Sequence, residues 1–241
     1  RNAGVEALMF DAEGENEMKL LIDYAGLDEI RRLYEYYPLD GVTTNPAILA
    51  AQGEEPYETL KKLRAFIGPE ADLHVQVVSP DAEGMLREAR SILDCLGQNT
   101  CIKVPVLPEG LKAIKRLALD GVRVTATVVF TPMQAVLAAH AGAAFVAPYV
   151  NSIENAGFDG VAVAETIHET FETQGIKTQV LAASFKNTYQ VQQLITFGIP
   201  VVTVVPEVLE GLLKSDLSAA RAARFVKDFE GLCGQGATME R

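Results

Sequence analysis

Short apolar runs rich in β-branched residues recur along the chain and are the main structural signal in the sequence. Runs that are apolar at nearly every position are typical of strands buried on both faces, as in a parallel sheet. We expect eight such strands, at residues 19–23, 41–44, 73–78, 101–106, 123–129, 145–148, 178–182 and 200–204. The pattern therefore predicts an eight-stranded parallel sheet.

Amphipathic segments of helical period separate these runs, and clear helix-start signals stand at Ser79-Pro80-Asp81 and Pro108-Glu109. Eight strand–helix units in a chain of 241 residues match the size of a closed (β/α)8 TIM barrel. An open doubly wound sheet is the main rival. Its dinucleotide-binding form would carry GxGxxG after the first strand, where this chain reads Asp23-Tyr24-Ala25-Gly26. The barrel is therefore favoured.

Two further helical segments follow the last predicted strand, at residues 207–213 and 218–232. The second is longer than closure of a barrel requires, so we expect an extra C-terminal helix. No linker-like Pro/Gly/Ser run interrupts the chain, which predicts one barrel domain over residues 18–241, with this helix included. Residues 1–17 are acidic and lack periodicity, and are predicted to be a disordered leader or an expression remnant.

The charge balance narrows the possible partners. Against 32 Asp and Glu there are 21 Lys and Arg, so the net charge is −11 at pH 7 and the sequence pI is about 4.8. Such a surface repels phosphodiester backbones and anionic lipid, so neither nucleic acid nor a membrane is an expected partner. The three cysteines form no CxxC pair, which is typical of a reducing compartment and predicts a cytoplasmic location.

Polar side chains stand near the carboxyl ends of seven of the eight predicted strands, where a purely structural barrel would carry apolar residues. Active sites of (β/α)8 barrels lie at that end, so we expect these side chains to converge there. The residues are Asp23, Thr43, Thr44, Asn45, Gln76, Lys103, Thr125, Thr127, Tyr149, Asn151, Ser184 and Lys186.

Lys103 is the most informative of these residues, because it stands between Ile102 and Val104 in a strand predicted to be buried. A buried lysine is rare without a chemical role or a charged partner. Desolvation lowers the pKa of a lysine and frees an amine that can form a Schiff base with a carbonyl compound. An ion pair with Asp23, present only for stability, explains the pattern equally well. On the pattern alone both interpretations stay open.

The other candidates also have structural explanations. The segment Thr43-Thr44-Asn45-Pro46 can be a turn that starts a helix, and Gln76 can be a core amide with satisfied hydrogen bonds. The three histidines, His74, His140 and His168, show no spacing typical of metal ligands, so no metal site is expected.

Asp23 and four longer segments form a specific combination in one order along the chain. The segments are Gly41-Val42-Thr43-Thr44-Asn45-Pro46, Ile102-Lys103-Val104-Pro105, Ala147-Pro148-Tyr149-Val150-Asn151 and Ala182-Ala183-Ser184-Phe185-Lys186. This combination strongly resembles the transaldolase family, and most closely the small bacterial branch that includes fructose-6-phosphate aldolase. The resemblance covers the chain from Met18 onward. It implies a (β/α)8 barrel and class I aldol chemistry on Lys103, with no metal and no cofactor.

The resemblance also implies roles for the other residues. Tyr149 would be the acid/base, Gln76 and Thr127 would position a water molecule, and Asp23 would transfer a proton or orient donor hydroxyls. The implied substrate-binding residues are Thr44, Asn45, Ser152, Ser184 and Lys186.

Three positions bear on the reaction and its substrate. Gln76 and Tyr149 stand where typical transaldolases of the family carry Glu and Phe, and this pair resembles the fructose-6-phosphate aldolases. A tyrosine hydroxyl can protonate the enamine left after cleavage, which favours release of dihydroxyacetone. Ser152 stands where the family usually has an arginine that grips phosphate, which leaves Ser184 and Lys186 as phosphate ligands.

The expected reaction is therefore cleavage or formation of a ketose such as fructose 6-phosphate, with dihydroxyacetone and an aldehyde such as glyceraldehyde 3-phosphate as partners. A non-phosphorylated or otherwise modified ketose is an alternative substrate. A transaldolase that passes the three-carbon unit to an acceptor aldose, and a barrel that binds a sugar without turnover, are alternative functions. The resemblance further implies a ring-forming homo-oligomer, with a decamer as one candidate and the C-terminal helix at the subunit contact.

Overall fold

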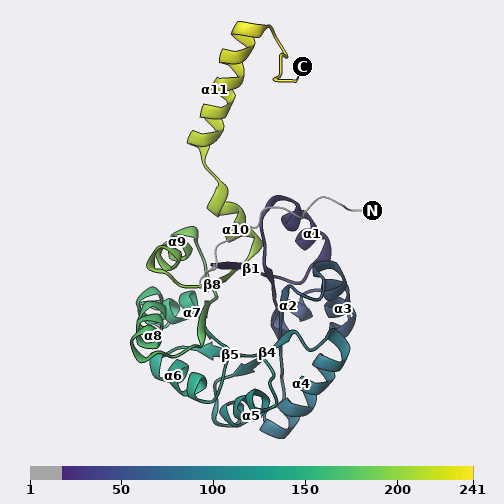
Figure 1. Ribbon diagram of the computed structural model, residues 1–241, viewed down its shortest axis with the longest axis vertical. Helices are drawn as coiled ribbons and strands as arrows, with labels where there is room; N and C mark the ends of the chain where they lie inside the picture. Colours follow the sequence, from purple (N-terminus) through teal and green to yellow (C-terminus); the bar gives the residue numbers. More distant parts are fainter. Residues whose placement is uncertain (1–17, 241) are drawn as a thin grey trace.

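The computed structural model describes residues 18–240, and its central feature is a closed barrel of parallel strands (Figure 1). Neighbouring strands follow chain order, and β8 pairs with β1 to close the barrel. The strands are β1 (Lys19–Asp23), β2 (Gly41–Thr43), β3 (Asp72–Gln76), β4 (Thr100–Pro105), β5 (Val124–Val129), β6 (Phe145–Pro148), β7 (Gln179–Ala182) and β8 (Val201–Val204). The predicted (β/α)8 barrel is confirmed, whereas the leader predicted at residues 1–17 lies outside the described residues.

Helices alternate with the strands, and all except the last, α11, lie around or beside the barrel in Figure 1. They are α1 (Leu27–Tyr36), α2 (Pro46–Ala50), α3 (Pro56–Ile67), α4 (Ala82–Leu96), α5 (Pro108–Leu119), α6 (Pro132–His140), α7 (Val150–Asn155), α8 (Gly160–Gln174), α9 (Thr188–Phe197), α10 (Pro206–Leu213) and α11 (Asp216–Cys233). The hydrophobic pattern did not predict the short helices α2 and α7. Both follow strand ends, at the face of the barrel where an active site is expected.

Local signals in the sequence explain where the elements begin and end. The carboxylate of Asp81 accepts a hydrogen bond from the amide of Gly84 at 2.9 Å and caps α4, and α5 begins at Pro108, as predicted. Strand β3 is predicted to reach Val78 but ends at Gln76. Val78 is exposed, and its amide donates to Glu88 of α4 at 2.7 Å, which draws the chain away from the sheet.

Alternation along the strands divides the apolar residues into two cores. The larger core lies between the sheet and the helices and includes Ile22 of β1 and Ile102 of β4. A smaller cluster, formed by strand residues of opposite parity such as Leu21, Cys101 and Phe145, fills the inside of the barrel. Both faces of the strands are therefore buried, which explains why the strands read as continuous apolar runs.

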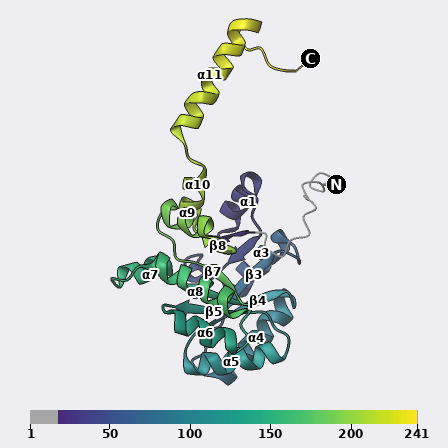
Figure 2. The same cartoon turned by 60° about the vertical axis from the view of Figure 1, so that its left-hand side comes forward.

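Helix α11 extends away from the barrel beyond α10, as both views show (Figures 1 and 2). None of its residues is buried, and it exposes Leu217, Phe225, Val226 and Leu232. The extra C-terminal helix is thus confirmed, and its apolar side chains have no cover from the rest of the described chain. No helix within residues 18–240 is both long and apolar enough to cross a membrane.

Candidate active site

A cavity of about 500 Å³ opens where β1 and β4 end and where the segments after β2, β6, β7 and β8 begin. The carboxyl ends of the strands are where (β/α)8 barrel enzymes carry their active sites, so this cavity is the candidate. Six residues predicted from the sequence line it, namely Asp23, Asn45, Lys103, Tyr149, Ser152 and Ser184.

Lys103 reaches the cavity from within β4, and only 4% of its surface is exposed. Its Nζ donates a hydrogen bond to the backbone oxygen of Thr44 at 2.9 Å. Burial lowers the pKa of the Lys103 ammonium, and the nearby carboxylate of Asp23 opposes this effect only in part. A lowered pKa enlarges the fraction of neutral amine near pH 7, which is the form that attacks a carbonyl carbon.

Asp23 ends β1, and its carboxylate is held by a threonine rather than by Lys103. Thr43 Oγ1 donates to Asp23 Oδ1 at 2.6 Å and lies 2.7 Å from Thr203 Oγ1. In residues 18–240 no ion pair joins Asp23 to Lys103, whose Nζ is bound to Thr44 instead. The geometry therefore gives no support to the interpretation in which Lys103 serves only as a stabilising partner of Asp23.

Tyr149 follows β6, and its hydroxyl lies 2.9 Å from Thr127 Oγ1 of β5. Burial raises the pKa of the Tyr149 phenol, and the carboxylate of Asp23 adds to this effect, while the hydrogen bond with Thr127 opposes it. A phenol with a raised pKa stays protonated at neutral pH. The pair therefore presents a proton donor, held in place by Thr127, at the wall of the cavity.

An irregularity in β5 accompanies the placement of Thr127. The register between β5 and β6 shifts between Ala126 and Val129, as at a β-bulge. Val128, inside this bulge, has φ of 62°, a left-handed conformation that is strained for a β-branched residue. Thr127 is fully buried whereas Val128 is partly exposed. Strain of this kind persists only where the surrounding structure enforces it, and it occurs often at functional sites.

The segment after β2 supplies a backbone acceptor and an amide. Asn45 Oδ1 accepts a hydrogen bond from the amide of Ile48 at 2.9 Å and caps α2, which leaves the amide nitrogen of Asn45 to donate to a ligand. Thr44 contributes its backbone oxygen to Lys103, while its hydroxyl donates to the backbone oxygen of His74 at 2.9 Å. The segment from Thr43 to Pro46 therefore starts a helix, as one interpretation predicted, and also contributes to the cavity, as the other predicted.

Ser152 in α7 and Ser184 after β7 face one another, with 3.1 Å between their hydroxyl oxygens. Ser184 has φ of 62°, so this residue too adopts a backbone conformation that favours glycine. Lys186 lies outside this arrangement. It is exposed and does not line the cavity, although its position two residues after Ser184 suggested a phosphate ligand.

Gln76 is the residue of β3 in register with Lys103 of β4. Strand alternation puts it on the same side as His74, whose ring contacts Phe145 inside the barrel. Gln76 nevertheless lines a second, apolar cavity between β3 and α2, α3 and α4, not the one that Lys103 lines. Within the described chain its side chain makes no hydrogen bond to Tyr149 or Thr127.

Sequence reasoning missed several residues of the cavity wall. Tyr24, Gln52, Phe185 and Glu207 line it as well. Glu207 could have been predicted by the search for polar residues near strand ends, because it stands three residues after the end of β8. Gln52 belongs to the turn after the short helix α2, which the hydrophobic pattern did not reveal.

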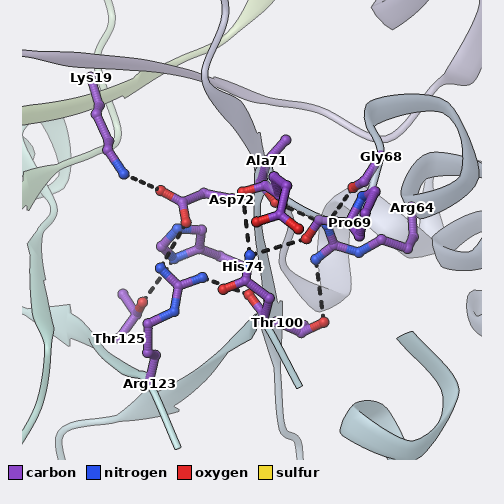
Figure 3. Close-up of polar contacts among 12 residues, drawn as sticks. Lys19, Arg64, Gly68, Pro69, Ala71, Asp72, His74, Thr100, Arg123 and Thr125 are labelled. Carbon is purple, nitrogen blue, oxygen red and sulfur yellow. Dashed lines mark hydrogen bonds and ion pairs between the residues drawn. The ribbon is translucent and has the colours of Figure 1, made fainter. Parts of the chain in front are cut away.

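A second polar cluster lies at the amino ends of the strands, opposite the candidate active site (Figure 3). Lys19 Nζ and Arg123 Nη1 each donate to a carboxylate oxygen of Asp72 at 2.9 Å. Arg64 donates to two loop carbonyls before β3, at 2.8 and 2.9 Å. Because the carboxylate of Asp72 is nearly inaccessible, loss of either cation would leave a poorly compensated buried charge. The cluster therefore stabilises this end of the barrel.

Asp72, His74 and Cys101, in this second cluster, are the one group of three potential metal ligands found within residues 18–240, with ligand atoms within 4.8 Å of one another. Both oxygens of Asp72 already accept hydrogen bonds from Lys19 and Arg123. These two cations would also repel a metal ion at this position. The group is therefore better described as part of the ion-pair cluster.

From the burial of His74 we expect a specific loss of folding stability in acid. Its Nδ1 is 2.8 Å from Thr125 Oγ1, and burial lowers the imidazole pKa from 6.5 to about 3. The folded state thus keeps His74 neutral while the unfolded chain takes up a proton, so stability falls as the pH drops from 6.5 toward 3. The slope from this one group approaches about 1.4 kcal/mol per pH unit.

Urea unfolding of His74→Gln between pH 7 and pH 4 should accordingly show a weaker pH dependence than the wild type, while His140→Gln, an exposed histidine of α6, should not. Asp72 also contributes to the loss of stability near pH 4. Burial raises its pKa, but the hydrogen bonds from Lys19 and Arg123 outweigh burial and hold it below 3.8, so the unfolded chain binds a proton there more readily than the folded one. The wild type and both variants share this contribution, so the difference between their slopes reports on the histidine. Equal slopes for the His74 variant and the wild type would mean that the histidine is protonated in the folded state.

The fold and the cavity together define a (β/α)8 barrel enzyme with a lysine-containing site at the carboxyl ends of its strands. A sequence model of the family described as transaldolase/fructose-6-phosphate aldolase matches residues 20–239. The chain belongs to this family, as its resemblance predicted.

Curated relatives agree with this assignment. The chain is 38% identical over 216 residues to a "Probable transaldolase" of Leptospira biflexa, which covers 89% of this chain and 99% of the relative. It is 41% identical over 194 residues to a "Probable fructose-6-phosphate aldolase" of Streptococcus pneumoniae, covering 80% of this chain and 87% of the relative. Membership supports aldolase or transaldolase activity on a sugar.

Proposed function

We propose that the protein is a metal-independent class I aldolase that cleaves or forms a ketose between C3 and C4, with dihydroxyacetone as the three-carbon product. The observation that carries this proposal is Lys103, a buried lysine of lowered pKa that lines the cavity at the carboxyl end of the barrel. Its neutral amine attacks the ketose carbonyl, and loss of water leaves a protonated imine. This imine is the electron sink that cleavage of the C3–C4 bond requires.

Cleavage needs a base for the hydroxyl at C4. We assign this role to Asp23, whose carboxylate lines the cavity and affects the pKa of Lys103 through its charge. As the proton of the C4 hydroxyl leaves, C4 becomes the carbonyl carbon of the departing aldehyde, the C3–C4 bond breaks, and its electrons form an enamine on Lys103. Asn45 donates from its amide to the substrate hydroxyls near the imine, beside Thr44, whose backbone oxygen holds the Lys103 amine.

Release of dihydroxyacetone needs a proton at C3 and a water molecule at the imine carbon. Tyr149, protonated and bound to Thr127, supplies the proton and takes it back from the attacking water. We also assign Gln76, in register with Lys103, to position the water with Thr127, a role that requires its side chain to turn from the apolar cavity that it lines toward the cavity of Lys103. Hydrolysis then returns the free lysine.

A transaldolase is the second candidate, because several curated relatives are named probable transaldolases. In that case the enamine attacks an acceptor aldehyde rather than being protonated. The two reactions are separated by incubating the protein with a ketose and measuring free dihydroxyacetone without and with an acceptor aldose. Release without acceptor supports the aldolase, and turnover only with acceptor supports the transaldolase. Binding of ketoses with no turnover would contradict both.

We also propose that residues 18–241 act as one domain in a ring-forming homo-oligomer, such as a decamer, in the cytoplasm. The exposed apolar residues of α11 support an intersubunit contact, and the three free cysteines fit a reducing compartment. Deletion of residues 215–241 should reduce the mass measured by light scattering to that of a smaller assembly. An unchanged mass would contradict the role of α11.

A further inference from the structure

The outer part of the cavity, away from Lys103, is lined by hydroxyl groups and a carboxylate. Lys103 lies within β4, whereas Ser152, Ser184 and Glu207 belong to segments beyond the strand ends and so to the rim. If Lys103 holds the ketose carbonyl, the far end of the substrate extends toward this rim. The chemistry of the rim therefore decides which terminal group the substrate carries.

The charge of the cavity wall is unfavourable for a dianionic group. Among the described residues that line it, Lys103 is the only cation, and it is the proposed imine-forming residue. Asp23 and Glu207 contribute two carboxylates. A phosphate at the rim would gain no charge-assisted hydrogen bond from a lysine or arginine of the lining and would share the cavity with the negative charge of Glu207.

Backbone amides at helix starts are the other common phosphate ligands. The amides of Val150 and Asn151, which begin α7, already donate to the backbone oxygens of Ala183 and Ser184 at 2.9 and 2.8 Å. Helix α10 begins with Pro206, which has no N–H, and Glu207 already provides the negative charge that its amino end favours.

In contrast, the rim suits a neutral polyhydroxylated chain. The hydroxyls of Ser152 and Ser184, 3.1 Å apart, can each donate and accept, and Glu207 can accept from a sugar hydroxyl. We infer that the site takes a non-phosphorylated ketose, and in the reverse direction a non-phosphorylated hydroxyaldehyde. This inference rests on the proposed aldolase function and specifies its substrate class.

The test is a comparison of kcat/KM for condensation of dihydroxyacetone with glyceraldehyde and with glyceraldehyde 3-phosphate. The wild type should prefer glyceraldehyde by about 10-fold or more, the effect of one unfavourable charged contact. Ser152→Arg and Glu207→Gln should each raise kcat/KM for the phosphorylated aldehyde relative to the neutral one. Glu210→Gln, on the same helix but outside the cavity and paired with Arg32, should leave the ratio unchanged.

Borohydride trapping of dihydroxyacetone on Lys103 is measured for every variant. A change in the ratio of the two kcat/KM values is interpreted only for variants that still form this adduct. A wild type that prefers the phosphorylated aldehyde while trapping normally would overturn the substrate inference and leave the aldolase proposal standing. A ratio that neither Ser152→Arg nor Glu207→Gln changes would likewise overturn it. Absence of both trapping and condensation would overturn the aldolase proposal and the inference with it.

Discussion

Replacement of Lys103 by methionine will abolish cleavage and condensation, with a loss of at least about 10⁴-fold, because the covalent pathway supplies most of the millionfold or larger acceleration typical of enzymes. The wild type, incubated with dihydroxyacetone and borohydride, will gain a reduced adduct on the peptide that contains Lys103. Mass spectrometry of the digested protein measures this directly. The methionine side chain retains the length and apolar character that the buried position requires.

Lys115→Met is the matched control, because Lys115 lies exposed on α5 and does not line the cavity, so its loss should change neither activity nor labelling. EDTA should not affect the wild-type rate if the imine is the electron sink. An adduct on a lysine other than Lys103, or inhibition by EDTA that added metal reverses, would contradict the mechanism.

Substitution of Tyr149 by phenylalanine will lower the release of free dihydroxyacetone by roughly 10²-fold or more, the usual scale for loss of a general acid/base. The variant lacks the hydroxyl that lies 2.9 Å from Thr127 Oγ1 but retains Lys103 and its contact with Thr44. Imine trapping should therefore persist, and transfer of the three-carbon unit to an added aldose should fall much less than release. Both rates are measured on the same preparation, by enzymatic detection of dihydroxyacetone and of the new ketose.

Thr127→Val should reproduce part of the defect, since it removes the partner that orients the phenol while leaving the phenol in place. Tyr189→Phe, at an exposed tyrosine of α9, serves as the control. If release and transfer decline equally in Tyr149→Phe, the hydroxyl acts before the enamine forms, and the preference for an aldolase over a transaldolase loses its main support.

Much of the barrel could be predicted because its signals are local. The strands buried on both faces appear as apolar runs, and start signals mark the helices between them, such as the cap Asp81 of α4 and Pro108 at the first position of α5. The misplaced end of β3 has a different cause. It depends on a contact outside the strand, the hydrogen bond from the Val78 amide to Glu88 of α4.

The candidate site was predicted in part, for a related reason. A polar residue near a strand end is visible in the sequence, and parallel strands bring such residues to one face, so six of the predicted residues line one cavity. Position near a strand end does not set the direction of a side chain, however. Lys186 satisfies the same rule as Ser152, since both follow a strand end by four residues, but Lys186 lies exposed and outside the cavity.

The sequence by itself thus determined the alternation of strands and helices and the extra C-terminal helix. It also singled out Lys103 as a lysine within a buried strand, because apolar neighbours on both sides of a lysine are visible in the local sequence. Only the tertiary structure decided which partners these residues have. It brought Thr44 to Lys103, Thr127 to Tyr149, and Glu207 to the cavity that Ser152 and Ser184 also line. These residues are distant in the chain, and their meeting depends on closure of the barrel and on the bulge in β5, which no local pattern encodes.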